Sequence, residues 1–345
     1  MKTANDRRLQ QVHDWLAQTL GSTDFSLAPA SADASFRRYF RVCQAGQSYI
    51  VMDAPPEQED CRPFIAVAAL FRQLGLNTPR VLAQDLAQGL LLLDDLGERL
   101  YLPELNEETA DKLYGDAIQA LLTLQSAPAE VVQAVALPAY DRPLLLDEMG
   151  LFRDWYLQRH LGLSLNKHDR AVLDTLFCFL ADAALSQPQV IVHRDYHSRN
   201  LLVCESRPDT PSGSNPGILD FQDAVMGPPS YDLVSLLRDC YIVWPRQRVE
   251  IWVAQYFEQA QARGILPAAM SQAQFMRDFD LMGIQRHLKA SGIFARLNYR
   301  DNKPGYLNDI PRTLGYITSI GASWPELEDF LGLLDRWHAT TAVAG

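Results

Sequence analysis

Two short stretches of this chain place oxygen-bearing side chains directly after apolar runs. In residues 190–203, the run Val-Ile-Val precedes a charged loop that contains Asp195 and Asn200. In residues 217–223, the run Gly-Ile-Leu precedes Asp220. A carboxylate such as Asp195 can accept the proton of an attacking hydroxyl, while an amide oxygen and a second carboxylate are the hard ligands that Mg²⁺ prefers. These residue types indicate phosphoryl transfer, in which positioning and charge neutralisation carry the rate.

The spacing within the two stretches strengthens this interpretation. His193 stands two residues before Asp195, Asn200 stands five residues after it, and the second stretch reads Asp-Phe-Gln from Asp220. This order matches the kinase pair HRDxxxxN and DFG. We expect the histidine to brace the loop, and Arg199 or the arginine just before Asp195 to serve the loop or the phosphates. Any one of these residues alone is more often a polar turn residue, but two motifs in order favour catalysis.

The two motifs resemble those of the aminoglycoside phosphotransferase/choline kinase superfamily of small-molecule kinases. More narrowly, the chain looks like the bacterial N-acetylmuramate/N-acetylglucosamine anomeric kinases of cell-wall recycling. That resemblance runs over nearly the whole chain and is carried by three stretches: ASFRRYFR at 34–41, MDAPP at 52–56 and LDFQDAVMGPPSYDLVSLLRD at 219–239. The motifs are specific for the superfamily and less specific for the sugar.

The resemblance implies an α+β, bilobal protein-kinase-like fold. Its β-rich N-lobe would span residues 1–96 and bind ATP, and its helical C-lobe would span residues 97–345 and hold the catalytic loop, the Mg²⁺ site and the sugar pocket. The implied reaction phosphorylates the anomeric (C1) hydroxyl of either amino sugar and yields sugar 1-phosphates for peptidoglycan recycling. By the same resemblance, Asp232 supports the site by accepting hydrogen bonds from the catalytic-loop backbone.

The bulk composition bounds the possible partners. A net charge of −11 argues against nucleic acid or an anionic membrane as the main partner. The five cysteines are scattered, odd in number and without CxxC spacing, which favours reduced thiols. The N-terminal residues are polar, and no apolar run approaches the roughly 18–20 residues of a membrane span. We therefore expect a cytoplasmic enzyme with a small-molecule substrate and no obligate protein partner.

The first hundred residues read as short strands with two helices. Apolar spacing predicts helices over 5–20 and 63–74, and β-branched or aromatic runs predict strands at 25–28, 39–42, 49–52, 81–83 and 90–93. The turn at 31–36 contains no glycine. Ser35 and the backbone amides beside it are therefore the candidates for holding phosphates, and a plain hairpin turn is the alternative.

The third of these strands departs from the kinase pattern. Kinases grip the nucleotide phosphates there with a lysine, whose expected position falls here at Met52 or Asp53. The chain has no lysine between Lys2 and Lys112, and the following helix has no glutamate to complete the usual ion pair. An arginine can replace the lysine, because its fork binds phosphate well. The candidates are Arg37, Arg38, Arg41 and Arg62.

The strand at 90–93 runs into acidic residues and a glycine. In a kinase-like order of elements this is the hinge, where backbone groups of Asp94, Asp95 and Leu96 would meet adenine. An ordinary strand end is the alternative. Beyond the hinge the pattern turns helical, with helices expected over 107–125, 143–160, 168–186, 249–263, 271–296, 311–318 and 325–337. Residues 205–217 are rich in Pro, Ser and Gly and predict an exposed, mobile hairpin tip.

The helical half contains the candidate sugar contacts. Glu148 and Asp154 are possible acceptors for sugar hydroxyls, although the helix that carries them is otherwise typical of core packing. A basic group is formed by His287, Lys289, Arg296 and Arg300. Its simpler interpretation is a solvated helix face. The sharper one is that Lys289 or Arg296 meets an acidic group of the substrate, such as the lactyl carboxylate of N-acetylmuramate.

Two other functions compete with a sugar kinase. An aminoglycoside or choline kinase would bind a cation, which this acidic composition permits. A catalytically dead nucleotide-binding module is suggested by the missing lysine. The presence of Asp195, Asn200 and Asp220 argues against the dead module, because loss of one of these residues is the usual mark of an inactive kinase.

Overall fold

The structure is a computed structural model that describes residues 2–31, 36–205 and 215–343. The chain divides into two compact units. Unit 1 comprises Met1–Arg99 and Leu202–Asp223, and unit 2 comprises Leu100–Leu201 and Ala224–Gly345. The division thus falls at Arg99 rather than at residue 96, and the segment that carries Asp220 belongs to the β-rich unit. Ser35 and most of the expected hairpin tip lie outside the described residues.

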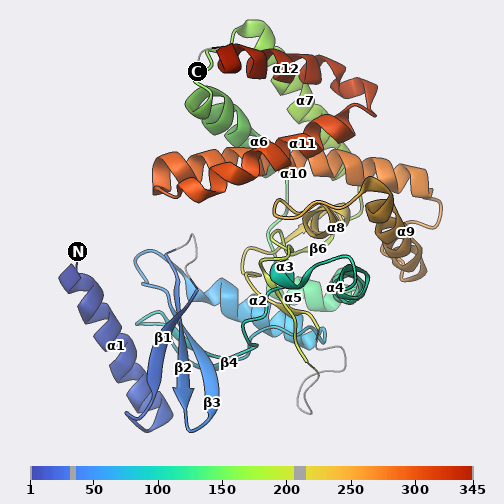
Figure 1. Cartoon of the computed structure of the whole chain (residues 1–345). Helices are drawn as coiled ribbons and strands as arrows, with labels where there is room; N and C mark the ends of the chain where they lie inside the picture. The colour runs from blue at the N-terminus through green and yellow to red at the C-terminus, as the bar shows by residue number, and fades with distance from the viewer. Residues whose placement is uncertain (1, 32–35, 206–214, 344–345) are drawn as a thin grey trace. The chain divides into compact units, whose positions relative to one another are not determined.

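Unit 1 is built on a five-stranded sheet in the order β1-β2-β3-β5-β4, with every neighbouring pair antiparallel (Figure 1). The strands are β1 (Ser26–Ser31), β2 (Arg38–Gln44), β3 (Gln47–Asp53), β4 (Val81–Asp85) and β5 (Leu90–Asp94). Helix α1 (Lys2–Leu20) covers one face, where its Val12 and Leu16 pack with Val42 and Val51 of the sheet. Alternate strand residues point to opposite faces, so this packing identifies the side chains on the α1 face.

Helix α2 (Cys61–Gln73) completes unit 1. Asp60 caps its start by accepting the Arg62 N–H at 2.9 Å, and Gly75 follows its end with a left-handed φ of +85°. Phe221 is fully buried and packs against two phenylalanines of α2 at ring distances of 4.8 and 5.7 Å. The strand β8 (Gly217–Ile218) is tied to the same unit by the Ile218 N–H, which donates to the Asn77 carbonyl. These contacts hold the Asp-Phe-Gln motif on α2.

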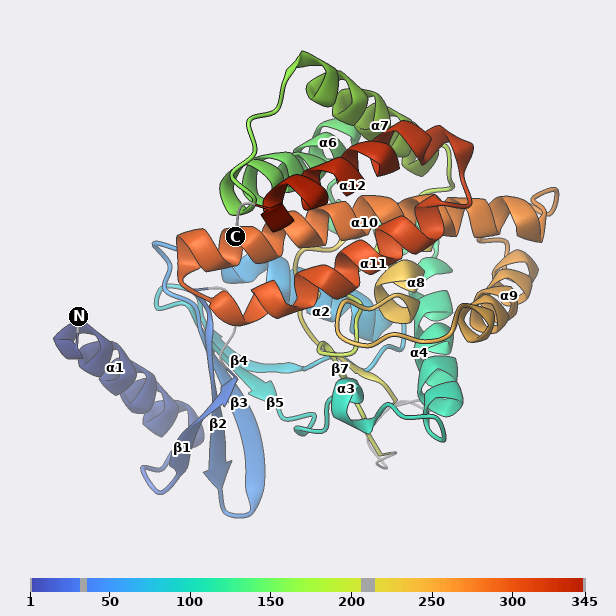
Figure 2. The ribbon, with the colours of Figure 1, turned by 45° about the horizontal axis from the view of Figure 1, so that its top comes forward.

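Unit 2 is helical, which confirms the predicted α+β class. Its helices are α3 (Tyr101–Glu104), α4 (Ala110–Gln125), α5 (Ala129–Val135), α6 (Arg142–Leu151), α7 (Lys167–Leu185), α8 (Ser230–Leu237), α9 (Arg246–Ala262), α10 (Gln272–Asp301), α11 (Ile310–Gly321) and α12 (Glu328–Val343), with short 3₁₀ turns at Pro304–Asp309 and Pro325–Leu327. The 30-residue α10 runs through this unit with α11 beside it (Figure 2). Strands β6 (Val190–Val192) and β9 (Val225–Gly227) pair antiparallel, and β7 (Leu201–Leu202) follows the catalytic loop. None of the described helices has the length and apolarity that a membrane crossing needs.

Unit 2 contains the helix predicted over 143–160, but not as one regular α-helix. The helix expected over 143–160 changes after Leu151 into a π-helix, Phe152–His160. At this junction Gly292 of α10 lies so close that a Cβ on it would be 2.5 Å from the Phe152 nitrogen, so helix packing accompanies a change that apolar spacing cannot reveal. Ser230 is the first residue of α8, and its hydroxyl donates to Gln187 at 2.7 Å.

Candidate active site

The predicted catalytic loop leaves strand β6 and is fixed at its start by one carboxylate. The buried Asp232 of α8 accepts hydrogen bonds from the backbone N–H groups of His193 and Arg194, at 2.6 and 3.0 Å. Burial raises the pKa of Asp232 to about 7, against the two N–H donors, which lower it. Arg194 itself has a left-handed φ of +77°, a strained conformation for a residue with a side chain. The support expected from Asp232 is therefore present as two hydrogen bonds.

Internal hydrogen bonds set the rest of the loop. The Asp195 N–H donates to Nδ1 of the buried His193 ring at 3.2 Å, so the histidine braces the backbone of Asp195. Asn200 donates through Nδ2 to the Asp195 carbonyl at 3.0 Å, and its N–H donates to the His197 carbonyl. Because Nδ2 is used in this way, Oδ1 is the atom with which Asn200 would bind a metal ion.

A second buried carboxylate, Asp239, supports the end of the loop. It accepts hydrogen bonds from the N–H and the hydroxyl of Ser198, and from the Tyr241 N–H at 3.1 Å. Arg199 lies with its guanidinium 3.5 Å from the centre of the Tyr241 ring, so it stacks on the segment that Asp239 holds. Sequence reasoning gave Asp239 no role. The available signal was a carboxylate two residues after the end of the apolar helix α8.

Behind the loop lies a buried ion-pair cluster formed by Glu148, Arg194 and Lys289. Glu148 accepts from Arg194, from Lys289 at 2.8 Å and from the Tyr140 hydroxyl. Lys289 also donates to the Tyr231 hydroxyl at 2.9 Å. Glu148 and Lys289 are only 5% and 9% exposed, so these two predicted sugar contacts meet each other in the interior. Burial raises the pKa of Glu148, but the positive charges of Lys289 and Arg194 lower it by more. The pKa of Glu148 therefore lies below its usual range.

The cluster has two cations and one carboxylate, and its excess positive charge acts on Asp195. Burial raises the pKa of Asp195, whereas Lys289, His197 and Arg286 lower it, and the result lies below the usual range. The Asp195 carboxylate is therefore ionised at neutral pH. An ionised carboxylate at this position can receive a proton from a hydroxyl.

The remaining predicted sugar contacts lie outside this cluster. Asp154, in the π-helix, pairs with the adjacent Arg153 at 2.7 Å. Arg296 of α10 is half-buried, and within the described part of the chain its Nε has no hydrogen-bond partner. The solvated-face interpretation is wrong for Lys289 and for His287, which is fully buried and stacks on Tyr316.

The candidate metal residue of unit 1 sits at a strained turn. Asp220 has a left-handed φ of +60°, and one of its carboxylate oxygens accepts the Gln222 amide at 2.7 Å. The other end of that amide, Gln222 Oε1, is buried without a hydrogen-bond partner among the described residues. A carboxylate and an amide oxygen are hard donors, so the chemistry of this turn fits Mg²⁺.

The predicted hinge carboxylates are held by arginines of unit 1. Asp94 accepts from Arg80 at 2.7 Å, and Asp95 accepts from Arg41 at 2.7 Å. The Asp94 N–H already donates to the Arg80 carbonyl, so it does not serve adenine. The Leu96 carbonyl accepts the thiol of Cys204 at 3.5 Å, a weak bond that a stronger donor can replace.

Comparison with known proteins gives a consistent family. A sequence model described as "Phosphotransferase enzyme family" (APH) matches residues 26–272. A protein of Pseudomonas putida named N-acetylmuramate/N-acetylglucosamine kinase is 47% identical over 345 residues, covering 97% of this chain and 98% of its own. A protein of the same name from Neisseria meningitidis is 42% identical and covers 95% of each chain.

Solved structures share the fold at much lower identity. The GDP complex of aminoglycoside 2'-phosphotransferase-IIIa superimposes with a TM-score of 0.61 at 15% identity, over 92% of this chain and 99% of that chain. Choline kinase LicA from Streptococcus pneumoniae gives a TM-score of 0.60 at 14% identity, over 91% of this chain and 99% of that chain. At such identities the likeness concerns the fold alone.

Proposed function

The chain belongs to the phosphotransferase enzyme family, and on this premise we propose that it is an ATP-dependent kinase of N-acetylmuramate and N-acetylglucosamine. It transfers a phosphoryl group to the anomeric hydroxyl and releases a sugar 1-phosphate for peptidoglycan recycling. The observation that carries the proposal is identity of 42–47% with kinases of that name over at least 95% of both chains. Because the reaction consumes ATP, it is assigned to the cytoplasm.

Asp195 is the base of the proposed reaction. An anomeric hydroxyl is more acidic than an ordinary alcohol, so a carboxylate kept ionised by nearby cations is a suitable acceptor for its proton. His193 and Asp232 position this carboxylate through the loop backbone, and Arg199 serves the loop or the phosphates. The proton of the sugar hydroxyl passes to Asp195 while the sugar oxygen bonds to the γ-phosphorus of ATP, and the bond between that phosphorus and the β,γ-bridging oxygen breaks to release ADP.

Asn200 and Asp220 would hold Mg²⁺ through one amide oxygen and one carboxylate. A bound Mg²⁺ would supply positive charge that neutralises the negative charge developing during transfer. On the nucleotide side, Ser35 and Arg37 are assigned to the phosphates. The backbone of Asp95 and Leu96 is assigned to adenine. Asp94 is also assigned to the hinge, but its N–H already donates to the Arg80 carbonyl and is not assigned to adenine.

The proposed sugar contacts are the two predicted residues that lie outside the ion-pair cluster. Arg296, half-buried on α10, is assigned to the lactyl carboxylate of N-acetylmuramate, and Asp154 to a sugar hydroxyl. Lys289 lowers the pKa of Asp195 and is also assigned to the acidic group of the substrate. Glu148 already accepts from three donors, so its part is to position Lys289 and Arg194.

Turnover on a panel of acceptors tests the proposal. Mg-ATP and the full-length protein are offered N-acetylmuramate, N-acetylglucosamine, kanamycin and choline, and ADP release is measured. We expect turnover with both amino sugars and none with the two cations. Turnover only on kanamycin or choline would discard the sugar assignment but keep the catalytic residues. No ADP from any acceptor would support a dead nucleotide-binding module.

A further inference from the structure

Strand β3 of unit 1 has an apolar residue at the position where a kinase has the lysine that binds the nucleotide phosphates. Val51 and Asp53 of β3 point to the α1 face of the sheet: Val51 packs in the α1 core and Asp53 pairs with Arg8 of α1 at 2.7 Å. Because strand residues alternate, Met52 points to the opposite face, where it is fully buried. A cation for that face has to come from another element.

Three of the four arginine candidates are placed elsewhere. Arg38 stands directly opposite Asp53 in the β2–β3 register and forms an ion pair with it, so it lies on the α1 face. Arg41 is held by Asp95 at the strand end. Arg62 is 78% exposed and pairs with Asp60, two residues away.

Arg37 is placed differently. It comes just before β2 and pairs at 3.0 Å with Glu59, which comes just before α2. Both side chains are largely buried, with exposures of 10% and 16%. Burial lowers the pKa of Arg37, but Tyr39, Glu59 and the carboxylates of Asp223 and Asp220 raise it above the ordinary value, so the guanidinium keeps its charge. The carboxylates that act on Arg37 therefore include the candidate metal residue.

We propose that the Arg37–Glu59 pair replaces the lysine–glutamate pair of kinases and that Arg37 binds the phosphates of the nucleotide. A guanidinium has five N–H donors in a fixed fork, so it can hold a glutamate and phosphate oxygens together. Glu59 fixes the fork between the turn before β2 and the start of α2, as the usual glutamate fixes the lysine between strand and helix. The inference rests on the proposed function only in requiring a bound nucleotide.

The test measures nucleotide affinity directly. Isothermal titration of the full-length protein with ADP and Mg²⁺ compares wild type, Arg37→Ala and the matched control Arg62→Ala, and steady-state kinetics give KM for ATP and for the sugar. Since a hydrogen bond to a charged group contributes about 1.5–3 kcal/mol, Arg37→Ala should weaken ADP binding and raise KM for ATP by about 10- to 100-fold. KM for the sugar and the Arg62→Ala affinity should stay at wild-type values.

A charge swap separates phosphate binding from a purely structural ion pair. R37E/E59R re-forms the pair but turns a carboxylate toward the phosphates, so its ADP affinity should stay as low as that of Arg37→Ala even where its melting temperature recovers. Wild-type affinity in either Arg37→Ala or the swap would overturn the inference. Wild-type protein that binds ADP but phosphorylates neither amino sugar would contradict the proposed function and leave this inference standing.

Discussion

Two of the ion clusters in unit 2, one centred on Glu148 and one on Arg248, differ in charge balance and in the burial of their carboxylates. The cluster of Glu148, Arg194 and Lys289 is interior, adjoins the catalytic loop and has one carboxylate for two cations. The cluster of Glu107, Asp111 and Arg248 joins α4 to α9 at the surface and has two carboxylates for one cation.

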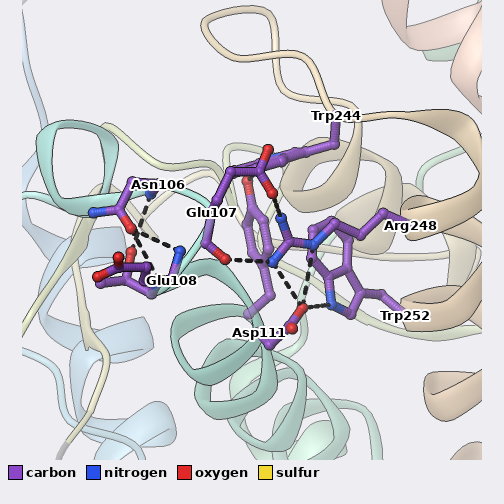
Figure 3. Close-up of polar contacts among 9 residues, drawn as sticks. Asn106, Glu107, Glu108, Asp111, Trp244, Arg248 and Trp252 are labelled. Carbon is purple, nitrogen blue, oxygen red and sulfur yellow. Dashed lines mark hydrogen bonds and ion pairs between the residues drawn. The ribbon is translucent and has the colours of Figure 1, made fainter.

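In the surface cluster, Arg248 lies beside Trp252 and is joined to Glu107 and Asp111 by ion pairs (Figure 3). Arg248 lies 4.8 Å from the ring centre of Trp244 and 5.1 Å from that of Trp252. Its acidic partners Glu107 and Asp111 are 79% and 72% exposed, and Trp252 donates to Asp111 at 3.0 Å. Exposed ion pairs contribute about 0–1 kcal/mol, so the arginine matters here chiefly for packing two helices together.

In the interior cluster the charged groups are buried, so their energetics differ from those of the surface cluster. Burying an ion costs several kcal/mol, and a well-packed apolar group in its place is often as stable or more so. In this protein its charge acts on Asp195: among the positive charges that lower the pKa of this carboxylate, Lys289 contributes most. Both clusters contain two ion pairs, so the number of ion pairs does not distinguish them. The Glu148 cluster differs because it adjoins the loop that contains Asp195, whereas the Arg248 cluster packs two helices together.

Asp195→Asn should have the largest effect, because it removes the group that the interior cluster serves. A general base contributes about 10²–10⁴-fold, so kcat should fall by that factor while ADP affinity stays near wild type. Stopped-time ADP assays and titration with ADP check both parts. A variant with near-normal kcat would show that the base is misassigned.

Lys289→Met should come next, since it leaves the buried Glu148 with one cation fewer. Removing one partner of a buried pair costs about 3–5 kcal/mol, and the free energy of unfolding should drop by that amount in a urea titration. The Arg248→Ala variant, measured alongside, provides a counterpart whose carboxylate partners are exposed. A loss of about 2 kcal/mol or less would place Lys289 in the same class as Arg248.

The pH dependence of stability should carry the signature of Glu148. Its pKa is lowered from the ordinary 4.5 in the folded state, so its contribution is full above about pH 4.5 and is lost as pH falls through the lower folded value. One proton limits this slope to about 1.4 kcal/mol per pH unit. Glu148→Gln should flatten the acid side of the stability profile, and an unchanged slope would contradict the ion-pair assignment.

Arg248→Ala should have the smallest effect. Loss of two exposed ion pairs and of contact with two tryptophans should lower the free energy of unfolding by about 1–2 kcal/mol, with kcat unchanged. Urea titration and the ADP assay check it. A kcat that fell with this variant would remove the distinction between the two clusters.

The sequence was informative where chemistry is encoded in local spacing. The kinase-like motifs, the α+β class and most helices and strands could be predicted, because His193, Asp195 and Asn200 lie within one loop and the elements follow simple periodicities. The strand β9 was not predicted, since its three residues pair with a distant strand rather than follow a pattern of their own.

Contacts between distant segments were the part that spacing could not supply. Glu148 and Lys289 looked like separate sugar contacts, yet they pair across α6 and α10. Arg37 was one of four equal candidates until strand register placed Arg38 on the other face of the sheet. The π-helix likewise occurs where Gly292 allows two helices to approach, which no local pattern announces.

The most direct test of the central claim is the ³¹P NMR spectrum of the product formed from N-acetylmuramate and Mg-ATP. The account predicts a phosphate resonance split by the anomeric proton, formed by wild type and lost with Asp195→Asn. A phosphate coupled to the C6 protons, or no sugar phosphate at all, would contradict phosphoryl transfer to the anomeric oxygen.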